Sequence, residues 1–344
     1  MTVSNPRILV TARQSAVGLA RLRELGTVDL AGEAVGRRPL SADELCIESP
    51  KHDVLIVETD PVTGDVLRRN PRLMAVACCR GNPVNVDAAT AAALGIPILY
   101  TPGRNAEAVA DFTIGLIISQ LRHIADSYHL LLSEQLTGGA HQAEMRTGGE
   151  NTWRTEDGVP RSRQFAGPEL NTLVLGIIGF GQIGRAVALR GLAFGMKVVA
   201  FDPYRRSRLS RVAMVSLPVL LRSADVISVH CKLTTETDGM IGAGELALVK
   251  PEAVLVNTAR AKVVDEVALV DALRRGALRG AALDVFREEP LPPESPFFAL
   301  PNVTLTPHLG GASSSVVERQ SGMVVEDLER LLSGRRPRHV FRLA

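Results

Sequence analysis

The sequence predicts an α/β protein with two domains, each built around a parallel sheet. Short apolar runs alternate with helix-forming segments along the chain, which is typical of parallel sheets covered by helices on both faces. The chain has 344 residues, more than the ~250–300 at which a single hydrophobic core stops growing. A glycine-rich turn occurs in only one of the two α/β halves, which indicates that the halves have different tasks.

The first half is a small α/β unit without a glycine fingerprint. Its predicted strands are Arg7–Ala12, Asp53–Glu58, Leu73–Cys79 and Ile96–Tyr100. Helical patterns lie between them, through Leu19, Leu22 and Leu25, at Thr63–Arg69 and at Val86–Leu94.

Next, a long helix is expected from near Asn105 to about Leu131, with Asn105 as its cap and Glu107 in its first turn. The stretch Thr137–Gly167 has little periodicity, and we interpret it as a surface loop around one anchor, Trp153.

The second half begins at Asn171 and repeats the alternation. Its predicted strands are Thr172–Ile178, Lys197–Phe201, Asp225–His230, Ala253–Asn257, Ala281–Val285 and Val303–Thr306. Its predicted helices are Arg185–Ala193 and Asp265–Arg274, and after Pro307 a helix through Val316–Leu332 ends at Gly334.

The glycine turn joins the first strand and the first helix of the second half. Gly179 suits a tight turn, Gly181 lets a pyrophosphate approach the backbone, and Gly184 lets helix and strand pack closely. The helix N-terminus offers N–H groups to phosphates. Asp202, 18 residues beyond Gly184, is placed to accept both ribose hydroxyls of an adenosine. The sequence therefore predicts a dinucleotide site.

Composition excludes several other classes. The net charge is +2 and aromatic residues make up 4%, which argues against a nucleic-acid surface. No apolar run reaches the ~18 residues of a membrane span, and the N-terminal residues lack a secretory pattern. Cys46, Cys78, Cys79 and Cys231 fit neither a zinc site nor a disulfide framework. We therefore expect a cytoplasmic protein without a metal site.

Three polar groups lie at the carboxyl ends of strands in the second half, where open α/β sheets bind ligands. Arg260 can grip a carboxylate with its planar fork. His308 can supply or remove a hydroxyl proton near neutral pH. A glutamate, Glu288 or Glu289, would fix the histidine tautomer by a hydrogen bond. Together with a nicotinamide, these groups suit hydride transfer to a 2-keto acid or from a 2-hydroxy acid.

The motifs occur in the order of a known family, and the resemblance covers nearly the whole chain. They are Asn105-Ala-Glu-Ala-Val-Ala110, Gly179–Gly184 with Asp202, Asn257-Thr-Ala-Arg260, Glu289-Pro290 and Pro307-His308. This chain resembles the D-isomer-specific 2-hydroxyacid dehydrogenases, which include phosphoglycerate, glyoxylate, formate and phosphite dehydrogenases.

The resemblance implies a Rossmann NAD-binding domain and a smaller flavodoxin-like substrate domain that close over a small anionic substrate, and it implies a homodimer. Pro102-Gly103 and Pro307 are typical of hinges between domains. We therefore expect the substrate domain to comprise residues 1–104 and 313–344, and the NAD domain to comprise residues 105–312.

The resemblance also implies residue roles. Arg260, Glu289 and His308 would be catalytic, Glu289 being favoured over Glu288 because the family's acid directly precedes proline. The resemblance further implies that NAD is the cofactor and that the following residues bind it: Gly179, Gly181, Gln182, Ile183, Gly184, Asp202, Val229, His230, Cys231, Thr258, Asp284 and Gly310.

A loop in the first half, Arg80–Asn85, would by the same resemblance offer backbone N–H groups to the substrate carboxylate, so we expect Arg80, Gly81 and Asn82 to bind the substrate together with Arg260. For the Arg80 side chain the alternative is that it only caps the loop. This loop departs from the family pattern because Asn82 replaces a common glycine, so the substrate itself does not follow from the resemblance.

Two alternatives stay open, and a third is disfavoured. Arg80 and Arg104 would suit a doubly charged head group, so the same chemistry could oxidise a phosphorus oxyanion or a hydroxyphosphonate. An NAD(H)-sensing corepressor-like protein would keep the same fold and residues. A methyltransferase is disfavoured by the third glycine and the Arg–Glu–His set.

Overall fold

The computed structural model describes residues 5–133 and 161–343. The chain divides into two compact units, Met1–Asn105 with Ala312–Ala344 (unit 1) and Ala106–Gly311 (unit 2). These bounds lie within one residue of the predicted domain limits, and the binding role assigned to each domain remains a prediction. Most of the expected loop Thr137–Gly167, including Trp153, lies outside the described residues.

The described part of unit 1 is built on a five-stranded parallel sheet with the order β2-β1-β3-β4-β5. Its strands are β1 (Arg7–Val10), β2 (Thr27–Leu30), β3 (Val54–Val57), β4 (Ala75–Cys78) and β5 (Ile98–Tyr100). Every residue of β3 and β4 is buried, as expected for parallel strands covered on both faces.

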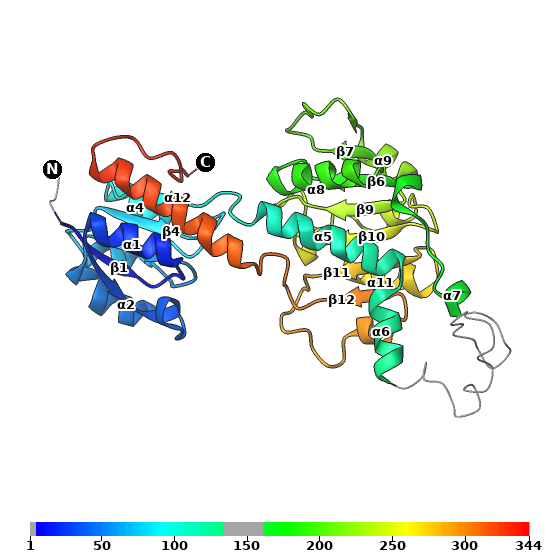
Figure 1. Ribbon diagram of the computed structural model, residues 1–344, viewed down its shortest axis with the longest axis horizontal. Helices are drawn as coiled ribbons and strands as arrows, with labels where there is room; N and C mark the ends of the chain where they lie inside the picture. Colours follow the sequence, from blue (N-terminus) through cyan, green and yellow to red (C-terminus); the bar gives the residue numbers. More distant parts are fainter. Residues whose placement is uncertain (1–4, 134–160, 344) are drawn as a thin grey trace, which may run out of the picture. The chain divides into compact units, whose positions relative to one another are not determined.

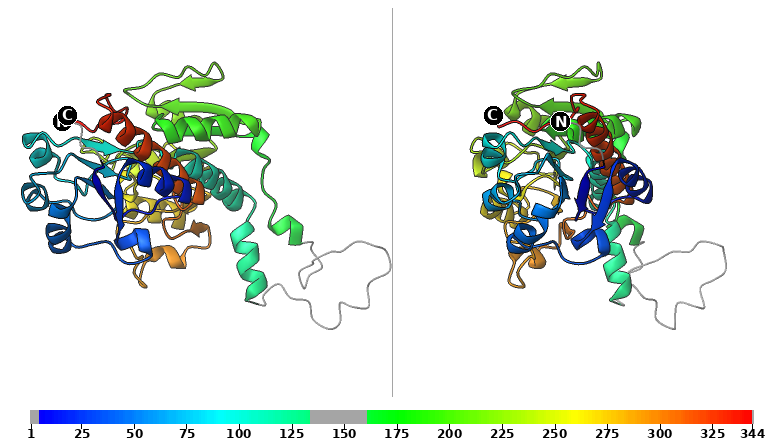
Figure 2. Two further views of the ribbon diagram at one scale, coloured as in Figure 1. Left: turned by 60° about the vertical axis from the view of Figure 1, so that its left-hand side comes forward. Right: turned by 90° about the vertical axis from the view of Figure 1, so that its left-hand side faces the viewer.

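Helices cover this sheet (Figure 1). They are α1 (Ala16–Leu25), α2 (Ala42–Glu48), α3 (Gly64–Arg68), α4 (Ala88–Ala93) and α12 (Ser314–Leu332), with 3₁₀ turns η1 (Gly32–Val35) and η2 (Ser49–Lys51). Helix α12, from the C-terminal part of the chain, belongs to unit 1 and lies beside α1 (Figure 2). The approach is close because a Cβ on Gly18 would lie 2.6 Å from Cβ of Ser321.

The described part of unit 2 is built on a seven-stranded parallel sheet with the order β12-β11-β10-β9-β6-β7-β8. Its strands are β6 (Val174–Ile178), β7 (Lys197–Phe201), β8 (Val212–Met214), β9 (Val226–Val229), β10 (Val254–Asn257), β11 (Gly280–Leu283) and β12 (Val303–Leu305). The chain runs outward from β6 in one direction and then from β9 in the other. The switch point between β6 and β9 is where such sheets bind ligands, at the carboxyl ends of the strands.

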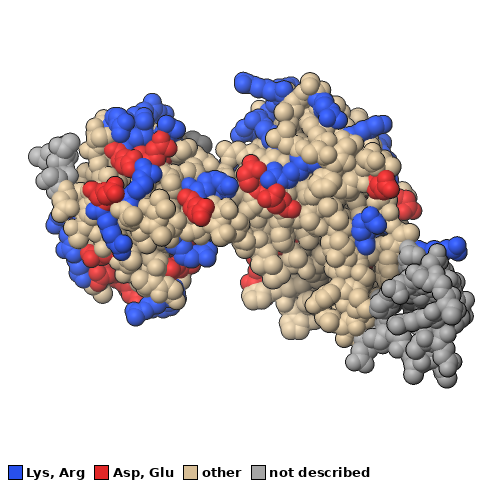
Figure 3. All heavy atoms as spheres, viewed as in Figure 1, with Lys and Arg blue, Asp and Glu red and all other residues tan. Residues whose placement is uncertain are grey.

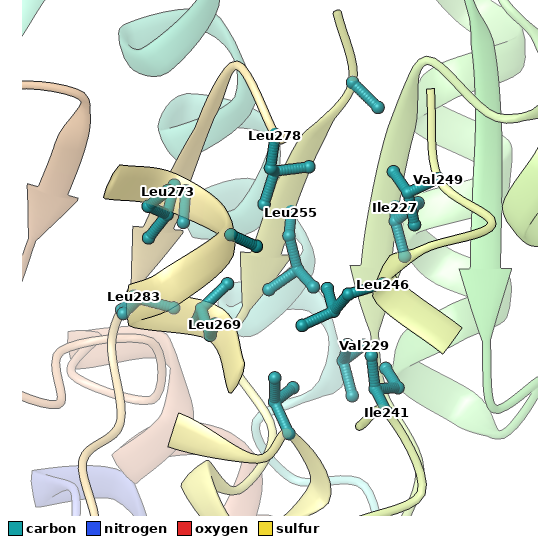
Figure 4. Close-up of a cluster of buried hydrophobic side chains, with 14 of the residues drawn as sticks. Ile227, Val229, Ile241, Leu246, Val249, Leu255, Leu269, Leu273, Leu278 and Leu283 are labelled. Atoms are coloured by element: carbon teal, nitrogen blue, oxygen red, sulfur yellow. The ribbon is translucent and has the colours of Figure 1, made fainter. Parts of the chain in front are cut away.

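The helices of unit 2 cover both faces of its sheet (Figure 1). They are α5 (Ala106–Leu121), α6 (Ile124–Leu132), α7 (Arg161–Gln164), α8 (Gln182–Ala193), α9 (Leu217–Ser223), α10 (Ala243–Leu246) and α11 (Glu266–Arg274), with 3₁₀ turns η4 (Leu170–Thr172), η5 (Ala261–Val263) and η6 (Pro296–Ala299). On one face, Leu269 and Leu273 of α11 pack with Leu255 and Leu283 of the strands (Figure 4). This core holds the strand ends that carry the polar motifs.

The long helix predicted from Asn105 to Leu131 is broken in the structure. Helix α5 ends at Leu121 and α6 begins at Ile124, with His123 in the left-handed region at φ 53°. Gly167 packs against the end of α5, where a Cβ would lie 1.9 Å from the Leu121 carbonyl oxygen. This contact joins residues distant in the sequence, so the helical pattern alone could not predict the break.

On the face shown in Figure 3, basic and acidic side chains are interspersed over both units. Among the described helices, none combines the length and apolar character needed to cross a lipid bilayer.

Candidate active site

The glycine turn of unit 2 has the geometry that its motif predicts. Gly179 has φ 92°, and a Cβ there would lie 2.5 Å from the backbone nitrogen of Cys231. A Cβ on Gly184 would lie 2.1 Å from the Gly179 carbonyl oxygen, whereas one on Gly181 would meet nothing within 4 Å. Gly179 and Gly184 are therefore required by packing, and Gly181 leaves open space in front of the backbone.

Helix α8 begins directly at this open space. Its N-cap is Gly181, which has no side chain to accept a hydrogen bond from the first turn. The N–H groups of Gln182 and Ile183 belong to that first turn, where N–H groups lack partners within the helix. The helix end therefore offers donors and a positive dipole to an anionic group.

Asp202 follows β7 and binds the glycine turn. Its Oδ2 accepts a hydrogen bond of 2.8 Å from the Phe180 N–H, and its Oδ1 accepts bonds of 2.9 and 3.0 Å from the N–H groups of Tyr204 and Arg205. A carboxylate has about four lone-pair positions, so capacity remains for a ribose hydroxyl. The carboxylate of Asp202 thus lies beside the turn, as the fingerprint requires.

The end of β9 borders the same turn. Val229 is fully buried, and His230 shares a hydrogen bond of 2.8 Å with the Ser228 hydroxyl through Nε2. Burial lowers the pKa of His230 to about 3, so its ring is neutral near pH 7. Its Nδ1 is buried without a partner among the described residues. Burial also raises the pKa of the Cys231 thiol to about 11, so neither side chain suits acid–base work.

Asn257 shapes the loop that carries Arg260. Its Nδ2 donates to the Arg260 carbonyl at 3.0 Å, and its Oδ1 accepts from the Ala259 N–H at 3.0 Å. The Thr258 hydroxyl is 2.9 Å from that of Thr113 on α5. The Arg260 side chain is exposed and, among the described residues, makes one hydrogen bond, from its NH1 to the Ala259 carbonyl, so most of its donors remain available.

Asp284 is buried at the end of β11 and holds the loop after β12. It accepts hydrogen bonds of 2.7 Å from the Thr306 hydroxyl, 2.7 Å from the Leu309 N–H and 2.8 Å from the Gly310 N–H. His308 lies within this loop at φ 56°. The buried carboxylate therefore fixes the backbone on both sides of His308.

His308 and Glu289 are directly joined. Nδ1 of His308 donates to Oε2 of Glu289 at 2.7 Å, and Oε1 of Glu289 accepts from the Phe286 N–H at 3.0 Å. Burial alone would raise the pKa of Glu289, but these hydrogen bonds and the charges of His308 and Arg260 lower it overall. This hydrogen bond fixes the tautomer of the imidazole. The other ring nitrogen, Nε2, has no partner among the described residues, and the His308 side chain is 51% exposed.

The loop Arg80–Asn85 lies in unit 1, after β4. Arg80 is half-buried, and its side chain makes no hydrogen bond or ion pair within the described part of the chain. Gly81 and Asn82 are exposed. Near this loop, burial raises the pKa of the Cys78 thiol to about 12. The positive charges of Arg80 and Arg104 act in the opposite direction on the same thiol, so both arginines lie near it.

Arg104 is committed to a buried network. Its NH2 lies 2.8 Å from Oε1 of Glu58, and its NH1 donates to the side-chain oxygen of Gln320. Glu58 is only 8% exposed. The charge of Arg104 is therefore balanced within unit 1, which removes one of the two cations behind the phosphonate alternative.

The structure brings part of the predicted site together within unit 2. The glycine turn, Asp202, the β9 end and the paired His308 and Glu289 all follow carboxyl ends of its strands. Within the described residues, no hydrogen bond or ion pair joins Glu288 to His308. Sequence reasoning missed the supporting roles of Asn257, which opens the motif of Arg260, and of Thr306, which ends a predicted strand directly before Pro307-His308. It also missed Glu58, which no motif marked.

These residues suit a dinucleotide. Open space in front of Gly181, an uncapped helix start and a carboxylate beside the turn correspond to a pyrophosphate followed by a ribose. The unpartnered Nδ1 of His230 adds a polar atom at the same edge. For a metal, no group of three or more candidate ligand side chains gathers within residues 5–133 and 161–343.

Comparison with known proteins gives consistent matches. Residues 131–310 match the family model described as D-isomer specific 2-hydroxyacid dehydrogenase, NAD binding domain. The chain is 34% identical to a glyoxylate reductase of Korarchaeum cryptofilum over 337 residues, covering 96% of this chain and 94% of that protein.

Two solved structures are also similar. One is an NADPH-dependent glyoxylate/hydroxypyruvate reductase of Sinorhizobium meliloti in complex with citrate, with TM-score 0.76, 28% identity and 98% of both chains covered. The other is a D-lactate dehydrogenase of Aquifex aeolicus complexed with NAD and lactic acid, with TM-score 0.71, 26% identity and 95% and 96% coverage.

Proposed function

This chain belongs to the D-isomer-specific 2-hydroxyacid dehydrogenase family, and from that premise we propose specific roles for its residues in an NAD-dependent reaction. The reaction is hydride transfer between a nicotinamide and a small 2-hydroxy or 2-keto acid. The observation that carries the residue assignment is the hydrogen bond of 2.7 Å between His308 and Glu289.

His308 is the proton donor and acceptor. With its Nδ1 proton held by Glu289, Nε2 is the ring atom that gives a proton to the substrate oxygen during reduction or takes one during oxidation. Glu289 positions the ring and stabilises the imidazolium form through its negative charge.

Arg260 binds the substrate anion. Its planar fork matches a carboxylate, and it polarises the neighbouring carbonyl. Asn257 orients it by fixing the loop backbone. We also assign substrate contacts to Arg80, Gly81 and Asn82 of unit 1. Gly81 and Asn82 are exposed, and the Arg80 guanidinium has no hydrogen-bond or ion-pair partner among the described residues.

NAD, when bound, accepts or supplies the hydride. We assign its pyrophosphate to the turn and first helical residues at Gly179, Gly181, Gln182, Ile183 and Gly184. Asp202 accepts from the adenosine ribose and, as an anion, opposes the 2′-phosphate of NADP, so NAD is preferred.

The remaining cofactor assignments follow the strand ends of unit 2. They are Val229, His230, Cys231, Thr258, Asp284 and Gly310. Asp284 has one lone-pair position left after its three hydrogen bonds, which suits a carboxamide N–H.

The test is a steady-state assay of NADH oxidation with a panel of 2-keto acids, comparing wild type with His308→Ala. We expect kcat to fall by roughly 10²–10⁴ in the variant, the usual contribution of a positioned proton donor, while the Kd for NADH, measured by fluorescence, is retained. Near-normal turnover by His308→Ala would remove this residue from the mechanism.

We also propose that the protein is cytoplasmic and forms a homodimer. Free thiols at all four cysteines are consistent with a reducing compartment, and the dimer follows the family resemblance. Sedimentation equilibrium of the purified protein tests the dimer.

A further inference from the structure

Two loops border the glycine turn of unit 2. In the sheet order β6 lies between β9 and β7, and it pairs with both in parallel. The segment after β7, residues 202–211 (the β7 loop), and the segment after β9, residues 230–242 (the β9 loop), therefore leave the sheet on either side of the turn that follows β6. Any ligand held at this turn lies between these loops.

Both loops are fastened to the turn and its strand at their bases. In the β7 loop, Oδ2 of Asp202 accepts a hydrogen bond of 2.8 Å from the Phe180 N–H. In the β9 loop, the His230 N–H donates to the Ile178 carbonyl at 2.7 Å. The bases of the two loops thus have defined positions relative to the turn.

Farther from the sheet, a pair of side chains joins the same two loops. The Tyr204 hydroxyl, in the β7 loop, donates a hydrogen bond to Oε2 of Glu236, in the β9 loop. This hydrogen bond raises the pKa of the Tyr204 hydroxyl above its ordinary value, so the hydroxyl stays protonated and remains a donor throughout the neutral range. Tyr204 and Glu236 therefore link the two sides of the site.

This hydrogen bond, and not packing, holds the Tyr204 ring in place. Tyr204 is 77% exposed, so its ring gains little from burial. Its backbone is fixed, because the Tyr204 N–H donates to Oδ1 of Asp202 at 2.9 Å. The side chain can therefore turn away from the β9 loop once its hydrogen bond to Glu236 is broken.

Glu236, by contrast, stands on a turn with its own internal hydrogen bonds. Oγ1 of Thr237 accepts from the Thr234 N–H at 2.8 Å and donates to the Lys232 carbonyl at 2.6 Å. These two bonds hold the backbone on both sides of Glu236. Its carboxylate is therefore the fixed acceptor of the pair, and Tyr204 is the partner that moves.

We propose that Tyr204 and Glu236 form a latch, which closes beside the adenosine half of the bound dinucleotide and slows its release. This inference rests on the proposed function, in which Asp202 binds the adenosine ribose. Tyr204 is two residues beyond Asp202, and its hydroxyl reaches the loop on the other side of the glycine turn. Both are positioning residues, because each holds the other. Loss of the latch therefore raises koff for the cofactor more than it lowers kon.

The first arm of the test measures the release of NADH by stopped-flow fluorescence from wild type, Tyr204→Phe, Glu236→Ala and the double variant. Tyr204→Phe keeps the ring and removes the donor, and Glu236→Ala removes the acceptor. We expect koff for NADH to rise about threefold to tenfold in each single variant, with an unchanged Tm because both side chains are exposed. The double variant should release NADH no faster than either single variant, because all three lack the same hydrogen bond.

Tyr128→Phe and Glu252→Ala are the matched controls, since they make the same changes at exposed residues of unit 2 outside both loops; they should keep the wild-type koff. Rates for Tyr204→Phe and Glu236→Ala within about twofold of wild type would overturn the inference. Effects that multiply in the double variant would also overturn it, because the two side chains would then act separately.

The second arm locates the effect on the cofactor. ADP-ribose contains the adenosine and the pyrophosphate but no nicotinamide, and its Kd is measured by isothermal titration calorimetry. We expect Tyr204→Phe to raise this Kd by the same factor as the Kd for NADH, whereas a loss confined to NADH would overturn the latch. If wild type bound neither NADH nor ADP-ribose, the proposed cofactor site would itself be wrong, and the latch with it. Wild-type binding with unchanged release in the variants would refute the latch alone.

Discussion

The carboxylate of Asp284 holds the backbone that carries His308. Its two oxygens accept hydrogen bonds from the N–H groups of Leu309 and Gly310 and from the hydroxyl of Thr306. His308 itself has φ 56°, a region that residues other than glycine seldom adopt. A buried acid at the end of β11 thus determines where the imidazole stands.

Asp284→Ala should therefore reduce both stability and turnover. The change leaves the buried N–H of Gly310 without an acceptor, which costs about 1–3 kcal/mol, and it also removes the partner of the half-buried Leu309 N–H and frees the loop around His308. Urea unfolding and kcat measure the two effects. Thr306→Val removes one donor and should give a smaller loss in both. If Asp284→Ala turned over substrate within about threefold of wild type, the loop would not depend on this carboxylate.

Glu289→Gln should change the pH dependence of the reaction, with Glu288→Gln as its control. The pKa of Glu289 is lowered, so its carboxylate is ionised throughout the neutral range. Its support of the imidazolium is present above the ordinary glutamate pKa and is lost only as pH falls through the lowered value.

In keto-acid reduction, kcat/KM of Glu289→Gln should lie below the wild-type value across the neutral range, because His308 loses its anionic partner, and the difference should narrow as pH falls through the lowered pKa of Glu289. The carboxylate that binds His308 is that of Glu289 and not that of Glu288, so Glu288→Gln should keep the wild-type profile. Matching profiles for all three proteins would contradict the role given to Glu289.

Much of the fold and of the unit 2 site could be predicted because the signals are local. The buried runs of β3 and β10 are continuous and apolar, and the turn after β6 has its glycines at fixed spacing. The choice of Glu289 over Glu288 depended on one neighbouring proline, and Glu289 is the residue that binds His308.

Other features depend on contacts between distant residues. Strand β2 has no fully buried residue and includes Asp29, so its apolar pattern is weak and sequence reasoning did not predict this strand. Helix α5 ends where Gly167 packs on it. Glu58, Arg104 and Gln320 form one network from three remote segments, and no motif predicts such a meeting.

Asp202→Ala should narrow or reverse the preference for NAD over NADP. The wild-type carboxylate opposes a 2′-phosphate, and its removal leaves the cations of Arg205 and Arg206 nearby in the sequence. We expect the ratio of kcat/KM for NAD to that for NADP to fall by on the order of tenfold or more.

Because Asp202 also accepts from the Phe180 N–H, Asp202→Ala loosens the glycine turn as well. Asp202→Asn keeps an acceptor oxygen and removes the charge, so it separates the two effects and should shift the ratio in the same direction. A wild-type enzyme with higher kcat/KM for NADPH than for NADH would show that Asp202 is wrongly assigned.

Gly181→Ala should impair cofactor binding without impairing folding. A Cβ at Gly181 meets nothing within 4 Å, and its φ of −75° is allowed for alanine, so the protein alone tolerates the methyl group. The space it would occupy is the approach to the backbone N–H groups of α8, where a pyrophosphate needs close contact. We expect the Kd for NADH to rise by about tenfold or more with an unchanged Tm.

Gly115→Ala is the matched control, because a Cβ there also meets nothing within 4 Å and the residue lies inside α5; it should keep the Kd and raise stability by up to about 1 kcal/mol. Gly184→Ala, which would place a Cβ 2.1 Å from the Gly179 carbonyl oxygen, should instead lower Tm. If Gly181→Ala bound NADH as wild type does, the pyrophosphate would not lie against this turn, and the open space at Gly181 would have no part in binding the cofactor.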